Sequence, residues 1–255
     1  MKATRNTPVP EPYPAALYEA VHSGNHGDVG FYERACKGAS SILELGCGWG
    51  RIARPLLRLG GRVTGLDVSD DLLSRARVHA PEARFVKGDM RDFDLGERFD
   101  RVLIPYNGIY CLLDEQDVIA TFRCAAQHLT PDGRLVFDAY AADAFHSEAE
   151  PDGDDDERSF VKTVTALGNT WDVYERSRWS RPRQRIDAIY DHVRRDDASQ
   201  VTSAIPQRYL LREQLPQLLA RAGLEVAAIH GGFHGEPADE DAPLTVVFAT
   251  PRDIA

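Results

Sequence analysis

An apolar segment that runs directly into three alternating glycines is the feature that most limits how this chain can fold. The segment 42–45 (ILEL) has the composition of a buried strand, and Gly46, Gly48 and Gly50 follow it at alternate positions. Glycine has no Cβ, so such a turn can bend tightly and let the backbone approach a ligand closely. A G-x-G-x-x-G turn would place its third glycine at position 51, where this chain has Arg51. The spacing therefore argues against a nicotinamide-dinucleotide site.

Strand-like and helix-like segments alternate along the first and last parts of the chain. The region between these two parts has another pattern. The predicted strands are 41–45, 62–66, 83–87, 99–105, 134–138, 224–230 and 243–250. The predicted helices are 49–59, 70–80, 115–129 and 212–222. Ser69 can cap the second of these helices, and Pro131-Asp-Gly133 predicts a turn. Repeated strand–helix units form a parallel sheet with helices on both faces, and we expect 243–250 to run antiparallel at the end of the sheet.

The central region has the pattern of an antiparallel insert. Alternating polarity and intervening turn residues predict strands at 160–167, 170–179, 185–194 and 201–209. The preceding segment 148–157 is acidic and contains glycine and proline, so we expect a solvated surface loop. Ahead of the first strand, 15–37 predicts two short helices separated by 22–27.

The chain is acidic, with 40 Asp and Glu residues, 30 Lys and Arg residues and a formal charge of −10. Duplex nucleic acid favours a basic face, so no nucleic-acid partner is expected. No apolar run approaches the roughly 18 residues of a membrane helix, and the first residues lack the apolar stretch of a signal peptide. We therefore expect a cytoplasmic protein without a membrane contact. Its four cysteines form no C-x-x-C pair, so no metal site is expected.

Two acidic segments downstream narrow the interpretation of the glycine run. Asp67 ends the second strand about 20 positions after Gly46, where a carboxylate accepts hydrogen bonds from ribose hydroxyls. The segment 88–93 (GDMRDF) follows the third strand. Together with the E-x-G-x-G-x-G turn, these segments resemble the class I S-adenosylmethionine (SAM)-dependent methyltransferases. The resemblance is close over 43–140 and looser over 210–250.

The resemblance implies SAM as the cofactor. In that family the acidic residue after the third strand accepts from the adenine amino group, so Asp89 would do so and Met90 would pack on the ring. Glu44 would face the methionine end of the cofactor. Arg51 would pair with the cofactor carboxylate, or it would be a surface residue at the start of a helix. The expected cofactor-binding residues are Tyr18, Glu44, Gly46, Cys47, Gly48, Gly50, Arg51, Asp67, Val68, Asp89, Met90, Arg91 and Pro105.

The branch of this family that the chain resembles most includes deoxysugar-amine and glycine N-methyltransferases. It implies an α/β fold, with a Rossmann-like seven-stranded sheet, an N-terminal helical lid and an antiparallel β insert after strand five. The expected divisions are a lid at 1–37, a core at 38–141 and 210–255, and an insert at 142–209. A lid tyrosine contacts the cofactor in this branch. Tyr18 matches it best, with Tyr13 and Tyr32 as alternatives.

The residues after the fourth strand form the expected acceptor side. Ile104-Pro105-Tyr106-Asn107 departs from the [ND]-P-P-[YFW] motif of DNA methyltransferases, which also disfavours a nucleic-acid substrate. Tyr106 and Asn107 would orient the acceptor or surround the sulfonium with oxygen and π density. Candidate proton acceptors at the carboxyl ends of later strands are Asp138, Tyr140, His230 and His234. Candidate acceptor-binding residues are Tyr110, Tyr140 and Arg208.

These features predict an enzyme that moves a methyl group from SAM to an N, O or C nucleophile of a small molecule, in natural-product biosynthesis. One alternative keeps the cofactor and changes the reaction to an intramolecular cyclisation of SAM that releases methylthioadenosine. A second alternative is a non-catalytic SAM-binding accessory protein. The sequence leaves open the acceptor, the attacked atom and the need for a general base. It also leaves open the oligomeric state, and a homodimer is one of the alternatives.

Overall fold

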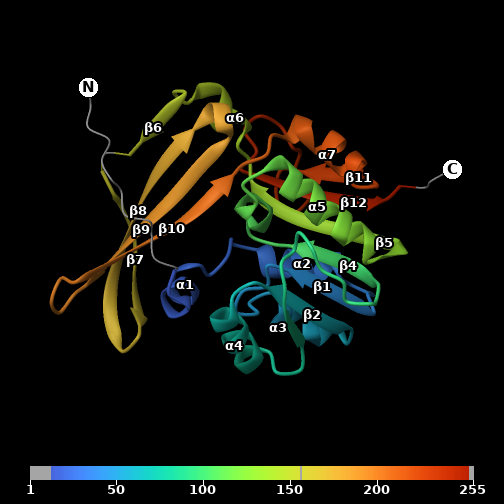
Figure 1. The fold of residues 1–255 in the computed structure, drawn as a ribbon, viewed down its shortest axis with the longest axis horizontal. Coiled ribbons are helices and arrows are strands. Elements are labelled where there is room, and N and C mark those ends of the chain that lie inside the picture. Colours follow the sequence, from blue (N-terminus) through green and yellow to red (C-terminus); the bar gives the residue numbers. More distant parts are fainter. Residues whose placement is uncertain (1–12, 156, 253–255) are drawn as a thin grey trace. The chain divides into compact units, whose positions relative to one another are not determined.

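The computed structural model describes residues 13–155 and 157–252 (Figure 1). These residues divide into two compact units. The insert unit contains the described residues up to Ser23 together with Glu150–Gln207. The sheet unit contains Gly24–Ala149 and the described residues from Arg208 onward. Residues 1–12 of the predicted lid and 253–255 of the predicted core lie outside the described residues.

The sheet unit is built on the predicted seven-stranded sheet (Figure 1). In spatial order its strands are β11 (Leu224–His230), β12 (Leu244–Pro251), β5 (Leu129–Tyr140), β4 (Phe99–Ile104), β1 (Ser41–Leu45), β2 (Arg62–Asp67) and β3 (Arg84–Lys87). The strands from β5 to β3 are parallel, whereas β12 is antiparallel to both of its neighbours. The predicted α/β fold is confirmed. β12 was expected at the end of the sheet, but it lies one strand inside because β11 forms the edge.

The helices of the sheet unit follow the predicted order. They are α2 (Asp28–Ala35), α3 (Ala53–Leu56), η1 (Leu57–Leu59), α4 (Asp70–His79), η2 (Gly108–Cys111), α5 (Glu115–Gln127), α6 (Asp143–Glu148), η4 (Arg212–Gln214) and α7 (Leu215–Arg221). The predicted cap is confirmed, because Ser69 Oγ accepts the N–H of Leu72 at 3.3 Å. The sequence did not predict α6.

Two of the differences from the predicted boundaries have a clear cause, which is a local turn in the first case and strand pairing in the second. The helix expected from residue 49 begins only at Ala53, because the glycine turn extends to Gly50, where φ is 81°. The turn expected at 131–133 lies inside β5. There the register of β5 against β4 shifts, since Phe99 pairs with Leu129 but Arg101 pairs with Arg134.

The insert unit carries the predicted antiparallel strands between β5 and β11. Its elements are α1 (Ala15–Val21), β6 (Asp152–Asp154), β7 (Ser159–Ala166), β8 (Asn169–Ser180), η3 (Arg181–Arg183), β9 (Arg185–Arg194) and β10 (Gln200–Arg208). Strands β6, β7 and β9 each pair antiparallel with β8. The acidic segment was expected to be a loop, but β6 in it pairs with β8, as Asp152 does with Ser180.

Helix α1 belongs to the core of the insert unit. Leu17 and Val21 of α1 pack with Val164, Trp171 and Val173 of the adjacent strands. Helix α2, in contrast, belongs to the sheet unit. The role of 1–37 as a lid stays a prediction. Within the part of the chain that the structure describes, no helix has the length and apolar character to cross a membrane.

Candidate active site

Three glycines form the turn at the carboxyl end of β1, and all three have positive φ angles. The values are 67° at Gly46, 53° at Gly48 and 81° at Gly50, in the region that residues with a Cβ avoid. The N–H groups of Gly46 and Cys47 both donate to the carbonyl of Leu66, at 2.8 and 3.1 Å. A Cβ at Gly48 would meet no atom within 4 Å. Backbone conformation therefore requires glycine here, and the turn borders open space.

Asp67, the last residue of β2, joins the glycine turn to the start of α4. Its Oδ2 accepts the N–H of Gly48 at 2.8 Å, and its Oδ1 accepts the N–H of Ser69 at 2.9 Å. Burial raises the pKa of this carboxyl, and the backbone N–H groups oppose that rise. Each oxygen keeps a further lone pair, so the carboxylate can also accept from a diol. The adjacent Val68 is 63% exposed, which leaves its side chain accessible to a ligand.

Asp89 and Arg91, both expected to contact the cofactor, are bound to each other. Arg91 Nη2 donates to Asp89 Oδ2 at 2.6 Å, and Arg91 Nη1 donates to Asp117 Oδ2 of α5 at 3.0 Å. The guanidinium holds the pKa of Asp89 below its ordinary value. Met90 lies beside the glycine turn, since its Cε would be 3.3 Å from a Cβ at Gly46. The loop is therefore close to the turn, and its contact with adenine stays a prediction.

Glu44 is a buried carboxyl with one unpaired oxygen. Its side chain lies in β1, with 3% of the residue surface exposed, and Oε2 has no hydrogen-bond partner. Burial raises the pKa of Glu44 to about 8, while Arg51 and the N–H of Ala53 act in the opposite direction. An acid of this kind is stabilised in its ionised form by any cation that approaches it. Glu44 therefore suits a positively charged group of a ligand.

Arg51, at the end of the glycine turn, is held by Asp28 of α2. Nη1 donates to Asp28 Oδ1 at 3.0 Å, and Nη2 lies 2.8 Å from Asp28 Oδ2. The Arg51 side chain is only 13% exposed, so the alternative of a surface arginine is wrong. Its guanidinium carbon also lies 5.4 Å from the ring centre of Tyr106, within the range of a cation–π contact.

Tyr106 and Asn107 follow β4 with two consecutive left-handed backbone conformations. Their φ angles are 55° and 60°, and each such non-glycine residue costs about 1–2 kcal/mol. Asp138 at the end of β5 holds both of them, because its Oδ1 accepts the N–H of Tyr106 at 2.9 Å and its carbonyl accepts that of Asn107 at 3.1 Å. Tyr32 of α2 donates to the same Oδ1 at 2.6 Å. Strain of this kind gathers at functional sites.

Asp138 resembles Glu44 in its environment. The residue is wholly buried, and its Oδ2 has no hydrogen-bond partner. Burial raises the pKa of Asp138 to about 6, and the hydrogen bonds from Tyr32 and Tyr106 oppose the rise. The ends of β1 and β5 thus each present a buried carboxyl that is incompletely paired. Arg51 lies near both of them.

Two expected acceptor-binding tyrosines lie next to this loop. The hydroxyl of Tyr110 donates to the carbonyls of Tyr140 at 2.9 Å and Leu210 at 3.2 Å. The two tyrosine rings meet edge to face at 4.9 Å. Asn107 Oδ1 accepts the N–H of Tyr140 at 2.7 Å. The structure therefore groups Tyr106, Asn107, Tyr110 and Tyr140 at neighbouring strand ends.

The remaining candidates are His230, His234, Tyr18 and Arg208. His230 ends the edge strand β11, and its ring lies 5.9 Å from that of Phe248. His234 follows in a loop, where its N–H donates to Glu236 at 2.8 Å. Tyr18 belongs to α1 in the insert unit, and Arg208 ends β10. Roles for these four residues stay predictions.

The sequence reasoning missed two residues that organise the site, Asp28 and Tyr32. Tyr32 was named only as an alternative lid tyrosine, and Asp28 was not singled out. Residues four apart on a helix share one face, and both are buried. An Asp and a Tyr four residues apart, just ahead of the first strand, form the pattern in the sequence that could have found them.

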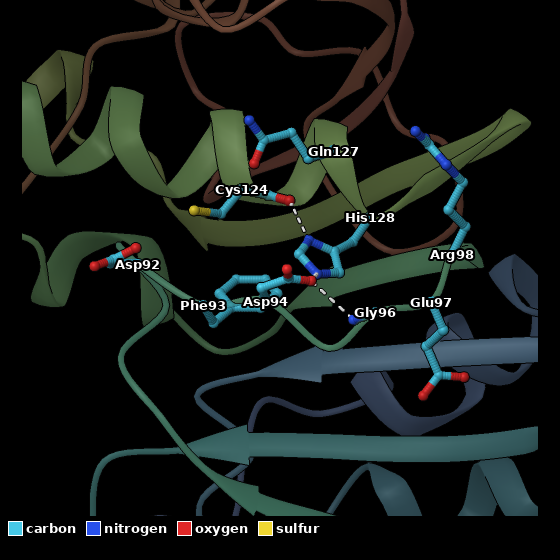
Figure 2. A pocket seen from close by; sticks show the side chains of 9 residues that line it. All are labelled: Asp92, Phe93, Asp94, Gly96, Glu97, Arg98, Cys124, Gln127 and His128. Carbon is cyan, nitrogen blue, oxygen red and sulfur yellow. Dashed lines mark hydrogen bonds and ion pairs between the residues drawn. The ribbon is translucent and has the colours of Figure 1, made fainter.

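A separate cavity of about 550 Å³ lies between the segment that precedes β4 and the end of α5 (Figure 2). Its lining residues are Asp92, Phe93, Asp94, Gly96, Glu97, Arg98, Cys124, Gln127 and His128. His128 Nδ1 lies 2.8 Å from the carbonyl of Cys124, and Nε2 accepts the N–H of Leu95 at 3.0 Å. Both ring nitrogens are thus engaged. The N–H of Phe99 at the start of β4 donates to the carbonyl of His128, so this cavity lies at the opposite end of β4 from Tyr106.

The glycine turn, Asp67 and the loop at Asp89 lie at the carboxyl edge of an α/β sheet, where such folds bind their ligands. This arrangement is that of a Rossmann-like protein, and it is the one expected for a nucleoside-type site. A family described as "Methyltransferase domain" matches residues 42–133. The cypemycin N-terminal methyltransferase of a Streptomyces species is 30% identical, over 77% of this chain and 77% of its own. The chain belongs to the class I SAM-dependent methyltransferases.

Two further similar proteins share a shorter segment or only the fold. The dTDP-3-amino-3,6-dideoxy-alpha-D-glucopyranose N,N-dimethyltransferase of Streptomyces fradiae is 35% identical over 49% of this chain and 52% of its own. The chain thus spans about half the length of that relative. The structure of the CcbJ methyltransferase from Streptomyces caelestis has a TM-score of 0.76 and 23% identity, and covers 94% of this chain and 99% of its own.

Proposed function

We propose that this chain transfers a methyl group from SAM to a nucleophilic atom of a small molecule, and that an amino-sugar nitrogen is the first acceptor to test. The observation that carries the proposal is the bond from the N–H of Gly48 to Asp67 Oδ2, at 2.8 Å. It joins a glycine turn that borders open space to a carboxylate suited to a ribose diol. The two features of a nucleoside site are thereby held together in one rigid edge.

The residues at this edge fit the charges of the proposed cofactor. SAM, when bound, supplies a methyl group on a positively charged sulfur and carries an ammonium group. The edge contains four buried carboxyls, Asp28, Glu44, Asp67 and Asp138, of which Asp28 is paired with Arg51. The unpaired oxygens of Glu44 and Asp138 would be stabilised by a cation. This charge balance favours a cationic ligand.

On the acceptor side, the chain's residues would act mainly by orientation. Methyl transfer is an in-line displacement, so its rate depends on alignment of the nucleophile with the methyl carbon and the sulfur. Tyr106 and Asn107 are the residues that we assign to this task, with Tyr110 and Tyr140 lining the acceptor. An acceptor ammonium must first lose its proton. Asp138, with its pKa raised to about 6, is suited to accept one.

The names of similar proteins support an amine as the acceptor. Two relatives besides the Streptomyces fradiae enzyme are N,N-dimethyltransferases of dTDP-amino sugars, with 34% and 30% identity. The cypemycin methyltransferase acts on an N-terminus. Sugar amines and peptide amines share an uncharged nitrogen lone pair as the attacking group. Two other relatives are ubiquinone biosynthesis O-methyltransferases, but the names with a nitrogen acceptor outnumber them, so we favour a nitrogen nucleophile.

The test incubates the enzyme with SAM and a panel of dTDP-amino sugars, free amino sugars and amines, and identifies the products by mass spectrometry. Acceptor-dependent S-adenosylhomocysteine and a methylated amine are expected. Methylthioadenosine formed without an acceptor would instead identify the cyclisation alternative. Tight SAM binding without turnover on any acceptor would identify the accessory-protein alternative.

A further inference from the structure

We propose that helix α2 sets the conformation of Tyr106 through a closed circuit of contacts, so that Asp28 and Tyr32 are positioning residues for the acceptor side of the site. The circuit consists of Asp28, Tyr32, Arg51, Tyr106 and Asp138, all within the sheet unit. The inference rests on the proposed function only where it assigns Tyr106 to the orientation of the acceptor. The contacts themselves are independent of it.

One branch of the circuit holds the ring of Tyr106. Asp28 grips both terminal nitrogens of Arg51, at 3.0 and 2.8 Å. The guanidinium so held lies 5.4 Å from the Tyr106 ring centre. Arg51 has many rotamers when free, so the ion pair with Asp28 is what keeps its charge at one place beside the ring.

The other branch holds the backbone of Tyr106. Asp138 Oδ1 accepts two hydrogen bonds, from the Tyr106 N–H at 2.9 Å and from the Tyr32 hydroxyl at 2.6 Å. The hydroxyl selects the rotamer in which this oxygen faces the loop. Without it, a buried carboxyl with a further unpaired oxygen would gain by rotating toward any other donor.

The two branches meet in α2, because Asp28 and Tyr32 are four residues apart and share one face. Helix α2 is anchored by packing, since Phe31 and Tyr32 belong to the main hydrophobic core. The positive φ of Tyr106, an aromatic residue, persists only where its surroundings over-determine it. A rigid helix that holds both the ring and the N–H of Tyr106 provides that constraint.

The direct test places 3-fluorotyrosine at position 106 and records its fluorine NMR spectrum without cofactor or acceptor. Tyr32→Phe removes only one hydroxyl, and Asp28→Asn reduces a two-pronged ion pair to a neutral contact. In the parent protein one narrow resonance is expected. In either variant the resonance should shift or broaden, because Tyr106 then exchanges between conformations.

Matched controls separate positioning from general loss of stability. Tyr209→Phe also removes the hydroxyl of a buried tyrosine, which lies 2.9 Å from His146 Nδ1. Asp100→Asn also removes the charge of a carboxylate. Asp100 accepts the N–H groups of Ser40 and Ser41 at the other end of the sheet. Both controls should leave the fluorine resonance of position 106 unchanged. Thermal unfolding of each variant measures how much stability it loses. An unchanged resonance in Tyr32→Phe, or an equal change in Tyr209→Phe, overturns the proposal.

Kinetics with an identified acceptor provide a second readout. Each variant should lower kcat about tenfold, as misplacement of a reacting group does. For Tyr32→Phe, which changes no charge, the Kd for SAM should change less than about twofold. Both branches hold the same residue, Tyr106. The kcat of the double variant, Tyr32→Phe with Asp28→Asn, should therefore also fall about tenfold and not about a hundredfold. Multiplying losses would mean independent effects and contradict the circuit. If no acceptor is found, the proposed function fails, while the NMR result still decides the present inference.

Discussion

The N–H of Gly48 donates to Asp67 Oδ2 at 2.8 Å, which joins the turn after β1 to the end of β2. The two residues are far apart in the sequence, and the parallel pairing of β1 with β2 brings them together. Because the same carboxylate also accepts the N–H of Ser69, the turn, the carboxylate and the start of α4 form one rigid edge.

Gly48→Ala should weaken SAM binding about tenfold or more, since a positive φ costs a residue with a Cβ about 1–3 kcal/mol. Isothermal titration with SAM measures the change. Gly60→Ala is the matched control, because Gly60 also has a positive φ and open space around a Cβ. It should lose comparable stability but keep its SAM affinity. Unaltered affinity in Gly48→Ala, and likewise in Gly46→Val, would contradict the site.

Asp67→Asn should lower the affinity for both SAM and S-adenosylhomocysteine by about tenfold to a hundredfold. The amide loses the charge that strengthens a hydrogen bond to a ribose hydroxyl, and its NH₂ group faces backbone donors. Titration of both nucleosides measures the loss. Asp71→Asn, an exposed change in the first turn of α4, is the control and should bind normally. A loss confined to one of the two ligands would argue against ribose as the contact.

The contribution of the buried Glu44 carboxyl to the free energy of unfolding should fall as the pH rises from 4.5 to about 8. Burial raises the pKa of Glu44 from 4.5 to about 8, so the folded state binds a proton more tightly than the unfolded state. Its stabilising effect is complete below pH 4.5 and is lost as the pH rises through 8, with a slope of at most about 1.4 kcal/mol per pH unit. Urea unfolding of Glu44→Gln should show a flatter profile, and a parallel profile would refute this assignment.

The preference for SAM over S-adenosylhomocysteine should grow between pH 6 and 8, because only SAM carries a sulfonium charge. The ionising groups are Glu44 and Asp138, with pKa values raised to about 8 and 6. The charged groups that face them are Arg51, Asp28 and Asp67, with the Tyr32 hydroxyl beside Asp138. Ionisation adds negative charge near the sulfonium, so SAM affinity rises while that of the neutral thioether changes little.

Titrations of both ligands across this pH range in buffers of different ionisation enthalpy would also reveal the proton released when SAM binds. Glu44→Gln should reduce both the proton release and the pH dependence of the ratio. A ratio that stays constant from pH 6 to 8 in the parent protein would show that these carboxyls do not sense the sulfonium.

Most of the sheet unit was predictable because its elements are set by local patterns. The alternation of apolar strands with amphipathic helices predicted the seven strands. The serine at position 69 predicted the N-terminal cap of α4. The late start of the helix at Ala53 has a local cause, the glycine turn that extends to Gly50, whereas the error in β5 arose where strand pairing overrides local chemistry. Pro131-Asp-Gly133 has the residues of a turn, yet pairing with β4 on both sides keeps it inside β5.

The candidate site divides in the same way. Gly46, Gly48 and Gly50 are identifiable from sequence because a positive φ is a local requirement that only glycine meets without strain. Arg51 was not assignable in this way, since a guanidinium can lie at the surface or be buried, and its ion pair with Asp28 decides which. Asp138 likewise reads as the last polar residue of a strand until Tyr32 and Tyr106 are seen to donate to it.

The sequence alone determined the fold class, because glycine spacing and strand ends are properties of short segments. Its resemblance to the class I SAM-dependent methyltransferases implied the cofactor, and the carboxyl edge of the sheet stays the predicted place where that cofactor binds. Only the tertiary structure decided which buried carboxyls lie beside that edge, how α2 reaches it, and why Tyr106 adopts a left-handed backbone. Those features depend on contacts between residues distant in the chain. Their energies come from burial and from hydrogen bonds that exist only once the sheet has formed.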